Sequence, residues 1–271
     1  MIGLFDSGFG GLHVLRGITG RLPEYDYIYL GDSARAPYGP RPSDDIYAYT
    51  KQGVEFLFDR GAELVVLACN TASSEALRRI QQDYQKKGST KKVLGVLIPF
   101  AEAAAARTRT KRVGVMATDG TVRSGSFPRE ITKVDCTIQV FQEACPLLVP
   151  LVEAGEQDSA RADELIRTYV GPLLEKNIDT LVLGCTHYGI LEEKIKDIVG
   201  KDIHIISDRD VMPESLASYL KRHPELEQRI GKNGTVRLCC TGNTQTFNAI
   251  GSIFFEKAVE AEHVTLDAQA V

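Results

Sequence analysis

Short apolar stretches alternate along the chain with longer stretches in which apolar residues recur at helical spacing. In most of the short stretches nearly every residue is apolar, which is typical of parallel strands covered on both faces. We expect these strands at residues 2–5, 27–30, 64–68, 93–97, 113–116, 138–141, 180–183, 203–206 and 236–238.

Helical periodicity fills the segments between these strands. In the first such segment Ile46, Gly53 and Leu57 fall on one stripe, and Ser43 is expected to cap the N-terminus. The repeated order of strand then helix predicts an α/β fold with mainly parallel sheet. The predicted helices lie at residues 43–60, 73–87, 99–109, 160–175, 191–199, 213–222 and 244–261.

One stretch of the chain resembles another. Residues 63–71 (ELVVLACNT) and 179–187 (DTLVLGCTH) both contain an acidic residue, an apolar strand, a small residue and a cysteine, Cys69 or Cys185. The two cysteines are 116 residues apart, which is close to the size of one small α/β domain. Buried strands often look alike, so chance similarity is one explanation. The other is a duplicated unit that gives two related domains.

Composition and charge exclude several classes of protein. The 271 residues are 43% hydrophobic and 25% charged, which argues against a disordered, collagen-like or disulfide-scaffold chain. The formal charge is −4 and no Lys/Arg-rich stripe is present, so nucleic acid is not expected as a primary partner. The longest uncharged run, residues 238–255, contains threonine, asparagine and glutamine and is too polar to span a bilayer, so no membrane partner is expected.

The N-terminus and the cysteines favour a cytoplasmic protein. The first apolar run lacks a basic region before it and ends at Asp6, so it predicts a buried strand and not a signal peptide. The six cysteines form no C-x-x-C pair, so no metal site is predicted and free thiols are expected.

Polar clusters follow five of the predicted strands. Ligands of open parallel sheets bind beyond the carboxyl ends of the strands, so these clusters should share one rim. The glycine-rich cluster lacks the G-x-G-x-x-G spacing of a dinucleotide site, and a turn whose backbone N–H groups bind a carboxylate fits equally well. The clusters are residues 6–11 (DSGFGG), 31–39 (GDSARAPYG), 69–72 (CNTA), 117–121 (ATDGT) and 185–188 (CTHY).

Cys69 and Cys185 are the most informative residues of these clusters. A thiol at a strand–helix junction feels the positive end of the helix, so we expect its pKa to lie below about 8.5. His187 is placed to tune Cys185, and Asp6 to tune Cys69, although a structural histidine and a helix N-cap are the plain alternatives. The other thiols lack such polar neighbours in the sequence and are expected in the core or near the surface: Cys136, Cys145, Cys239 and Cys240.

Several motifs in order resemble the bacterial glutamate racemases of the aspartate/glutamate racemase family. The resemblance runs from residue 2 to about residue 255. The motifs that carry it are residues 6–8 (DSG), 37–39 (PYG), 69–72 (CNTA), 144–147 (ACPL), 150–153 (PLVE) and 184–188 (GCTHY).

This resemblance implies two flavodoxin-like α/β domains related by a pseudo-two-fold axis, with the active site in the cleft between them. No proline-, glycine- or serine-rich linker is present, so the domains are expected to exchange segments. We expect residues 1–97 with 209–271 in the first domain and residues 98–208 in the second. Relatives are often dimers, and whether this chain forms a homodimer stays open.

The resemblance also implies a cofactor-independent racemase that interconverts L- and D-glutamate and supplies D-glutamate for peptidoglycan. By that likeness Cys69 deprotonates D-glutamate, Cys185 deprotonates L-glutamate, and Asp6 and His187 assist the two thiols. Inverting a carbon without turning the substrate over does need an acid and a base on opposite faces. Further positions match residues that hold the substrate: Ser7, Pro37, Tyr38, Gly39, Asn70, Thr71, Thr118, Thr121 and Thr186. Acidic positions often placed near the site are matched by Asp32 and Glu153.

Three other functions stay open from the sequence. One is an aspartate or hydantoin racemase that uses the same mechanism with two thiols. Another is a thiol hydrolase or amidotransferase in which Cys185 and His187 are nucleophile and base. The third is a binding protein that lost turnover. Residues 189–190 (GI) and 207–209 (SDR) differ from the residues that relatives usually have there.

Overall fold

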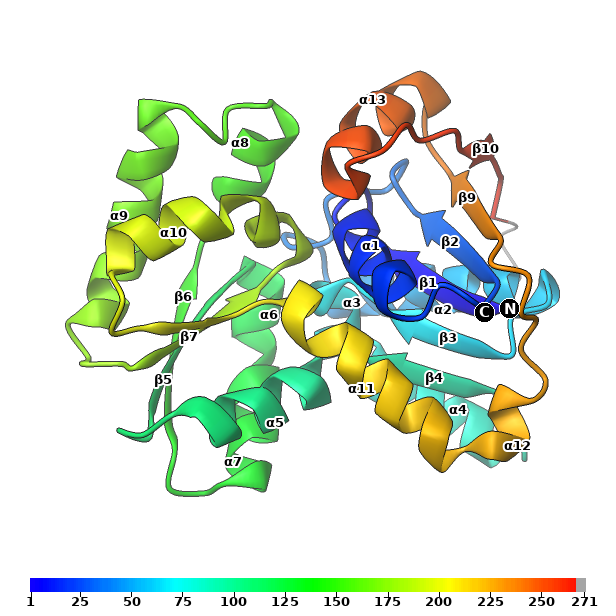
Figure 1. The fold of residues 1–271 in the computed structure, drawn as a ribbon, viewed down its shortest axis with the longest axis horizontal. Helices are drawn as coiled ribbons and strands as arrows, with labels where there is room; N and C mark the ends of the chain where they lie inside the picture. The colour runs from blue at the N-terminus through cyan, green and yellow to red at the C-terminus, as the bar shows by residue number, and fades with distance from the viewer. Residues whose placement is uncertain (267–271) are drawn as a thin grey trace.

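The computed structural model describes residues 1–266, in which two parallel sheets lie side by side (Figure 1). The first sheet has the strand order β10-β9-β2-β1-β3-β4, and the second has the order β6-β5-β7-β8. All of their strand pairs are parallel, so the predicted α/β fold is confirmed. The strands of the first sheet are β1 (Ile2–Asp6), β2 (Tyr27–Gly31), β3 (Leu64–Leu67), β4 (Lys92–Gly95), β9 (Val236–Cys240) and β10 (Glu262–His263). Those of the second are β5 (Arg112–Ala117), β6 (Gln139–Ala144), β7 (Thr180–Gly184) and β8 (His204–Ile206).

We call each sheet with its helices a lobe, the first lobe comprising residues 2–95 and 208–263 and the second comprising residues 97–206. The helices of the first lobe are α1 (Gly11–Arg21), α2 (Ser43–Asp59), α3 (Asn70–Glu75), α4 (Leu77–Lys86), α11 (Asp208–Arg222), α12 (Pro224–Glu227) and α13 (Thr244–Phe255). Those of the second lobe are α5 (Leu97–Arg107), α6 (Asp119–Ser124), α7 (Ser126–Val134), α8 (Leu148–Glu153), α9 (Ala160–Leu174), the 3₁₀ helix η1 (Thr186–Leu191) and α10 (Glu192–Val199). The predicted domain boundaries at residues 97 and 209 stay a prediction.

The four central strands are arranged alike in the two lobes. The order β2-β1-β3-β4 of the first sheet has the same pattern as β6-β5-β7-β8 of the second. The two similar stretches seen in the sequence are β3 and β7, which hold corresponding places in these sheets. This agreement favours a duplicated unit over chance similarity.

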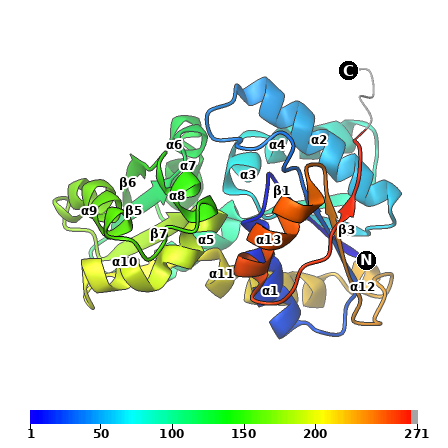
Figure 2. The same cartoon turned by 90° about the horizontal axis from the view of Figure 1, so that it is seen from above.

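Alternating side chains of the first sheet build two cores. Ile2 and Leu4 of β1 belong to a core shared with α1 and α11, whereas Phe5 belongs to a second core with α2 and α4. These two helix layers lie on opposite faces of the sheet (Figure 2). The first core continues into the second lobe, where it includes Phe100 of α5 and Phe127 of α7. The lobes are therefore joined by apolar packing as well as by the chain.

Some local predictions are corrected by the structure. Pro42 occupies the N-cap position of α2, and Ser43 is already helical, so its hydroxyl donates to Glu75 Oε2 at 2.8 Å and caps nothing. The predicted helix 73–87 is two helices, α3 and α4, because the backbone breaks its regular course at Ala76. Strand β4 ends at Gly95, since Leu97 already begins α5. Among the described residues, none of the helices combines the length and apolar character that a membrane crossing needs.

Candidate active site

The carboxyl ends of strands from both lobes meet at one place. The hydroxyl of Thr186, which follows β7, donates to Asp6 Oδ2 of β1 at 3.4 Å. Gly10 lies so close to the same threonine that a Cβ atom at position 10 would stand 2.2 Å from Thr186 Oγ1. The two rims are thus in direct contact, as expected for parallel sheets whose strand ends face one another.

Cys69 lies at the N-terminus of α3 in the first lobe. Its sulfur caps the helix by accepting the Ala72 N–H at 3.4 Å, and its S–H donates to Ser7 Oγ at 3.4 Å. The thiol is buried. The next residue, Asn70, has a buried side-chain amide whose nitrogen and oxygen both lack a hydrogen-bond partner. A buried amide without partners is costly, so this group is available to a ligand.

Cys185 of the second lobe has a different environment. It follows β7 and precedes the 3₁₀ helix η1, and its sulfur lies 4.0 Å from His187 Nδ1. The other ring nitrogen, Nε2, lies 2.9 Å from Glu153 Oε1. When Glu153 is ionised it accepts the Nε2–H, which leaves Nδ1 as the acceptor that faces the thiol. The sequence-predicted residues Cys185, His187 and Glu153 are therefore brought together.

His187 also joins the two lobes. Its ring meets that of Phe254, from α13 of the first lobe, edge to face at a centroid distance of 5.1 Å. Glu153 ends α8 of the second lobe, and Figure 1 shows α8 and α13 at the same end of the two lobes. Phe254 was not predicted as a site residue, because an apolar side chain in a helix is indistinguishable from a core residue in the sequence.

Asp6 is completely buried at the centre of this arrangement. Its Oδ1 accepts the Gly8 N–H at 2.8 Å, in addition to the contact of Oδ2 with Thr186. Burial raises the pKa of the Asp6 carboxyl, an effect that the charge of His187 opposes. Asp6 therefore holds its proton more readily than an exposed aspartate does.

A cluster of threonines links α3 to α6 across the lobes. Thr71 Oγ1 lies 2.8 Å from Thr118 Oγ1 and 3.4 Å from Thr121 Oγ1. Gly39 packs against the same place, since a Cβ on Gly120 would lie 2.8 Å from the Gly39 carbonyl oxygen. Three hydroxyls that exchange hydrogen bonds with one another can turn to an anionic ligand without leaving a donor unpaired.

Asp32 serves the loop that carries Tyr38. Its Oδ2 accepts the Tyr38 hydroxyl at 2.5 Å and Arg35 Nε at 2.7 Å, while its Oδ1 accepts the Thr241 hydroxyl at 2.8 Å. Both carboxylate oxygens are thus occupied, so Asp32 holds the loop of residues 37–39 in place. Thr241 was not predicted, although it directly follows the strand β9 and the rule of strand ends would have found it.

Both thiols hold their protons more tightly than the sequence predicts. Burial, and then the charge of Asp6, raises the pKa of Cys69 to about 11. Burial raises the pKa of Cys185 well above its ordinary value, and the charges of Cys69, Asp6 and Asp208 add to this effect. The prediction of lowered pKa values is wrong because removal from water outweighs the dipole of the adjoining helix.

Three further buried polar side chains near the lobe contact lack hydrogen-bond partners. They are the imidazole of His13, the hydroxyl of Ser207 and the carboxyl of Asp208. Burial raises the pKa of Asp208 well above its ordinary value and lowers that of His13 to about 4, so the His13 imidazole is neutral at pH 7. Ser207 and Asp208 directly follow β8, so the rule of strand ends would have found them, whereas nothing in the sequence separated His13 from surface polar residues. Within residues 1–266, no three His, Cys, Asp or Glu side chains are grouped so that they could hold a metal ion.

Comparison with known proteins identifies the family. The family model described as Asp/Glu/Hydantoin racemase matches residues 12–207. The chain belongs to the Asp/Glu/Hydantoin racemase family. The predicted resemblance to this family is confirmed, and with it the prediction that the protein is an isomerase of the racemase class.

Relatives within the family resemble the chain over nearly its whole length. The glutamate racemase of Jannaschia sp. (strain CCS1) is 38% identical over 97% of this chain and 99% of its own. The glutamate racemase of Geobacter metallireducens is 38% identical over 99% of this chain and 97% of its own. The crystal structure of glutamate racemase isoform RacE1 from Bacillus anthracis aligns with a TM-score of 0.90 at 32% identity, over 98% of this chain and 97% of that one. The glutamate racemase of Francisella tularensis in complex with D-glutamate aligns with a TM-score of 0.89 at 30% identity, over 99% and 98%.

Proposed function

We propose that this racemase interconverts L-glutamate and D-glutamate by proton transfer between the substrate and two thiols, Cys69 and Cys185. The observation that carries the proposal is the place of the two cysteines, each beyond the corresponding strand of two similar sheets whose rims touch. The glutamate racemases among its relatives support glutamate as the substrate.

The reaction then proceeds in two proton transfers. In the D-to-L direction the Cys69 thiolate removes the Cα proton, and the electron pair of the C–H bond stays on the substrate as a carbanion. The Cys185 thiol protonates the opposite face and becomes the thiolate. The reverse direction exchanges the two roles. A thiol with a raised pKa is a stronger base toward the weakly acidic Cα–H, although less of it is ionised at neutral pH.

Neighbouring groups accept the thiol protons before catalysis. His187 Nδ1 faces the Cys185 sulfur at 4.0 Å and serves as its acceptor. For Cys69 we assign this role to Asp6, whose charge acts on the Cys69 thiol. Both groups assist by holding a proton near the sulfur in the small fraction of molecules in which one thiol is ionised and its counterpart is protonated. The two sulfurs titrate as a coupled pair because the charge on one acts on the other.

The remaining predicted residues are assigned to substrate binding. Asn70 offers an unpartnered amide beside Cys69, and Thr186 offers a hydroxyl beside Cys185. Donors fixed in a buried site stabilise the charge that develops on the α-carboxylate as the proton leaves. The other residues assigned here are Ser7, Pro37, Tyr38, Gly39, Thr71, Thr118 and Thr121.

Aspartate is the less favoured substrate. The aspartate racemase of Picrophilus torridus aligns with a TM-score of 0.56 at 18% identity, a likeness that extends to the fold alone. We also propose that the product D-glutamate serves peptidoglycan synthesis in the cytoplasm, because a mechanism with two free thiols needs a reducing compartment. All six cysteines are unpaired in the structure. A homodimer stays a prediction.

The decisive experiment incubates the protein with L-glutamate in heavy water without added cofactor. Proton NMR should show loss of the Cα proton signal, and polarimetry should show the optical rotation falling to zero. Exchange with aspartate but not with glutamate would move the assignment to an aspartate racemase. A Cys69→Ala/Cys185→Ala double variant is the control for contaminating racemase. No exchange with either amino acid would overturn the proposed function.

A further inference from the structure

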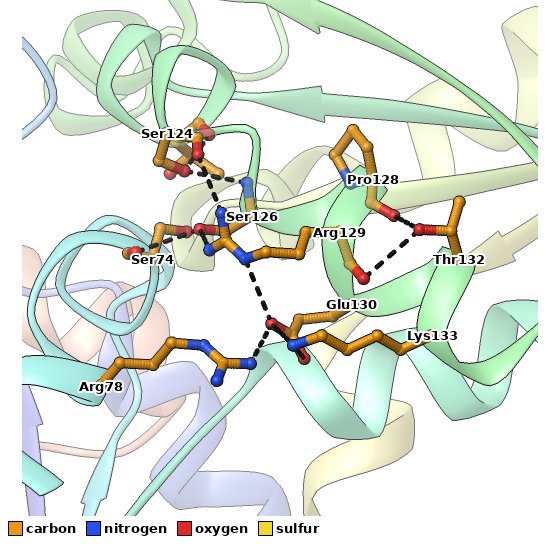
Figure 3. A network of polar contacts seen from close by, with 10 residues as sticks. Ser74, Arg78, Ser124, Ser126, Pro128, Arg129, Glu130, Thr132 and Lys133 are labelled. Carbon is orange, nitrogen blue, oxygen red and sulfur yellow. Dashed lines mark hydrogen bonds and ion pairs between the residues drawn. The ribbon is translucent and has the colours of Figure 1, made fainter. Parts of the chain in front are cut away.

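A buried carboxylate of the second lobe forms an ion pair with the first lobe. Glu130 of α7 is 7% exposed, and its Oε1 accepts Arg78 Nη2 of α4 at 2.5 Å (Figure 3). Lys133 Nζ lies 3.1 Å and Arg129 Nε 3.5 Å from the same oxygen. Of these three cations only Arg78 comes from the first lobe, so its ion pair crosses between the lobes.

A second contact crosses beside the first. The Ser126 hydroxyl of α7 donates to the backbone carbonyl of Ser74, in α3, at 3.1 Å. Arg129 connects the two crossings, because its Nη2 donates to Ser126 Oγ at 2.7 Å while its Nε faces Glu130 (Figure 3). One network of five side chains therefore spans both lobes: Arg78, Ser126, Arg129, Glu130 and Lys133.

The first-lobe ends of this network lie just behind a reactive thiol. Helix α3 has six residues, begins directly after Cys69 and uses the Cys69 sulfur as its N-cap. Ser74 is in that helix, and Arg78 lies in the first turn of α4, which follows it. A shift of α3 would therefore move the Cys69 sulfur with it.

Apolar packing does not fill the space beside the network. A cavity of about 290 Å³ lies between α4, α5, α7 and α11, and it is lined by Arg78, Arg129 and Glu130 together with Leu77, Leu97 and Met212. Close packing fixes neighbouring elements in most protein interiors, and a cavity removes that constraint. Beside this cavity the polar contacts add to the apolar packing that joins the lobes and help to fix their spacing.

We propose that Arg78, Glu130 and Ser126 form a positioning clamp that holds α3, and with it Cys69, at a fixed place relative to the second lobe. This inference rests on the proposed two-thiol function, because the clamp matters to the rate only if Cys69 and the second-lobe thiol act on one substrate. None of the three residues touches the reacting atoms. Misplacement by about 1 Å can lower a rate roughly 100-fold, so a small loss of position has a measurable effect.

The test compares two neighbouring arginines of α4. Arg78→Ala removes the ion pair between the lobes, whereas Arg79→Ala removes an ion pair with Asp44 inside the first lobe, at 2.7 Å. We expect Arg78→Ala to lower kcat roughly tenfold while KM changes less, and Arg78→Lys to restore most of the loss. Glu130→Gln should act like Arg78→Ala, which keeps the test available if one variant folds poorly. Arg79→Ala should leave kcat within about twofold of the wild type.

A second readout does not depend on turnover. Alkylation of Cys69 by iodoacetamide, followed by mass spectrometry, should be several-fold faster in Arg78→Ala than in the wild type, with the exposed Cys136 as the internal reference. If Arg78→Ala matches Arg79→Ala in either kcat or the alkylation rate, the clamp is overturned. If the wild type itself does not racemise glutamate, the proposed function fails, while the alkylation result still decides whether the lobes are clamped.

Discussion

The two halves of the candidate site place a thiol at the same point of the same fold and surround it differently. Cys69 caps an α-helix and contacts a backbone N–H and the Ser7 hydroxyl. Cys185 precedes a 3₁₀ helix and faces an imidazole that is held by Glu153. The first thiolate is thus stabilised by hydrogen-bond donors, and the second arises beside a proton acceptor. Duplication of a strand order does not preserve the local chemistry.

The thermodynamics of the proposed reaction limits how this difference between the two thiol environments can be measured. L- and D-glutamate have equal free energies, so kcat/KM must be equal in the two directions for any variant. A defect in one half of the site therefore lowers kcat/KM equally in both directions, and a difference between the directions can appear only in kcat or in KM taken separately. Measurements that report kcat/KM alone cannot distinguish the Cys69 half from the Cys185 half.

The largest effect is expected from removing either thiol. Cys69→Ser and Cys185→Ser should each lower kcat/KM by roughly 10²- to 10⁴-fold, because each removes one of the two groups that transfer the proton. Polarimetry with L- and with D-glutamate measures the loss. Cys136→Ser, which changes an exposed thiol, is the matched control. A Cys69 variant that keeps more than half of the activity would point to the single-nucleophile alternative.

The pH dependence should follow from the raised thiol pKa values. At neutral pH the Cys69 thiol, with a pKa of about 11, is almost fully protonated, and the Cys185 thiol also titrates above its ordinary range. As long as the pH stays below the pKa, each increase of about one pH unit raises the thiolate fraction about tenfold. We therefore expect kcat/KM to rise between about pH 7 and about pH 8.5. Initial rates at constant ionic strength measure this profile. A profile that is flat or falls over that range would show that substrate binds to an already ionised site.

A smaller effect is expected from Asn70→Ala. The buried amide has no partner in the free protein, so its loss should leave the melting temperature nearly unchanged while raising KM roughly tenfold or more. Asn243 gives the matched control, because its side chain caps α13 by accepting the Thr246 N–H at 2.9 Å. Asn243→Ala should lower the melting temperature and leave KM unchanged. The reverse pattern would remove Asn70 from the substrate site.

The smallest effect, and the sharpest for the comparison, is expected from Glu153→Gln. The substitution keeps the shape of the side chain and removes the charge that orients His187. We expect kcat to fall roughly fivefold to tenfold in the direction in which Cys185 removes the proton, and less in the other direction. Progress curves from each enantiomer give both values. Equal falls in the two directions would mean that Glu153 supports both halves alike.

The sequence predicts the sheets well because their signal is strong and local. All nine predicted strands are present within three residues of their expected bounds, since apolar runs of this kind have few alternatives. The strand-end rule also located both thiols, the threonines and Asp6. Two of the missed elements are helix α1 (Gly11–Arg21), whose glycines weaken the helical signal, and strand β10, which has only two residues.

What the sequence did not provide is the electrostatics of the site. The direction of the thiol pKa values depends on how completely water is excluded, which is decided by residues from both lobes. The contacts between the lobes, such as Thr186 with Asp6, likewise depend on how two separately predicted sheets meet. Local patterns place the residues on a rim, and only the folded chain shows which rims touch.

The apolar core that runs from β1 through α11 into the second lobe affects how the protein folds and unfolds. The two halves share one strand order, yet part of the apolar surface of each is covered by the other. Separating the second lobe, residues 97–206, from the rest of the chain would expose that surface to solvent. The two halves should consequently melt together, in a single cooperative transition, even though each carries a sheet of its own.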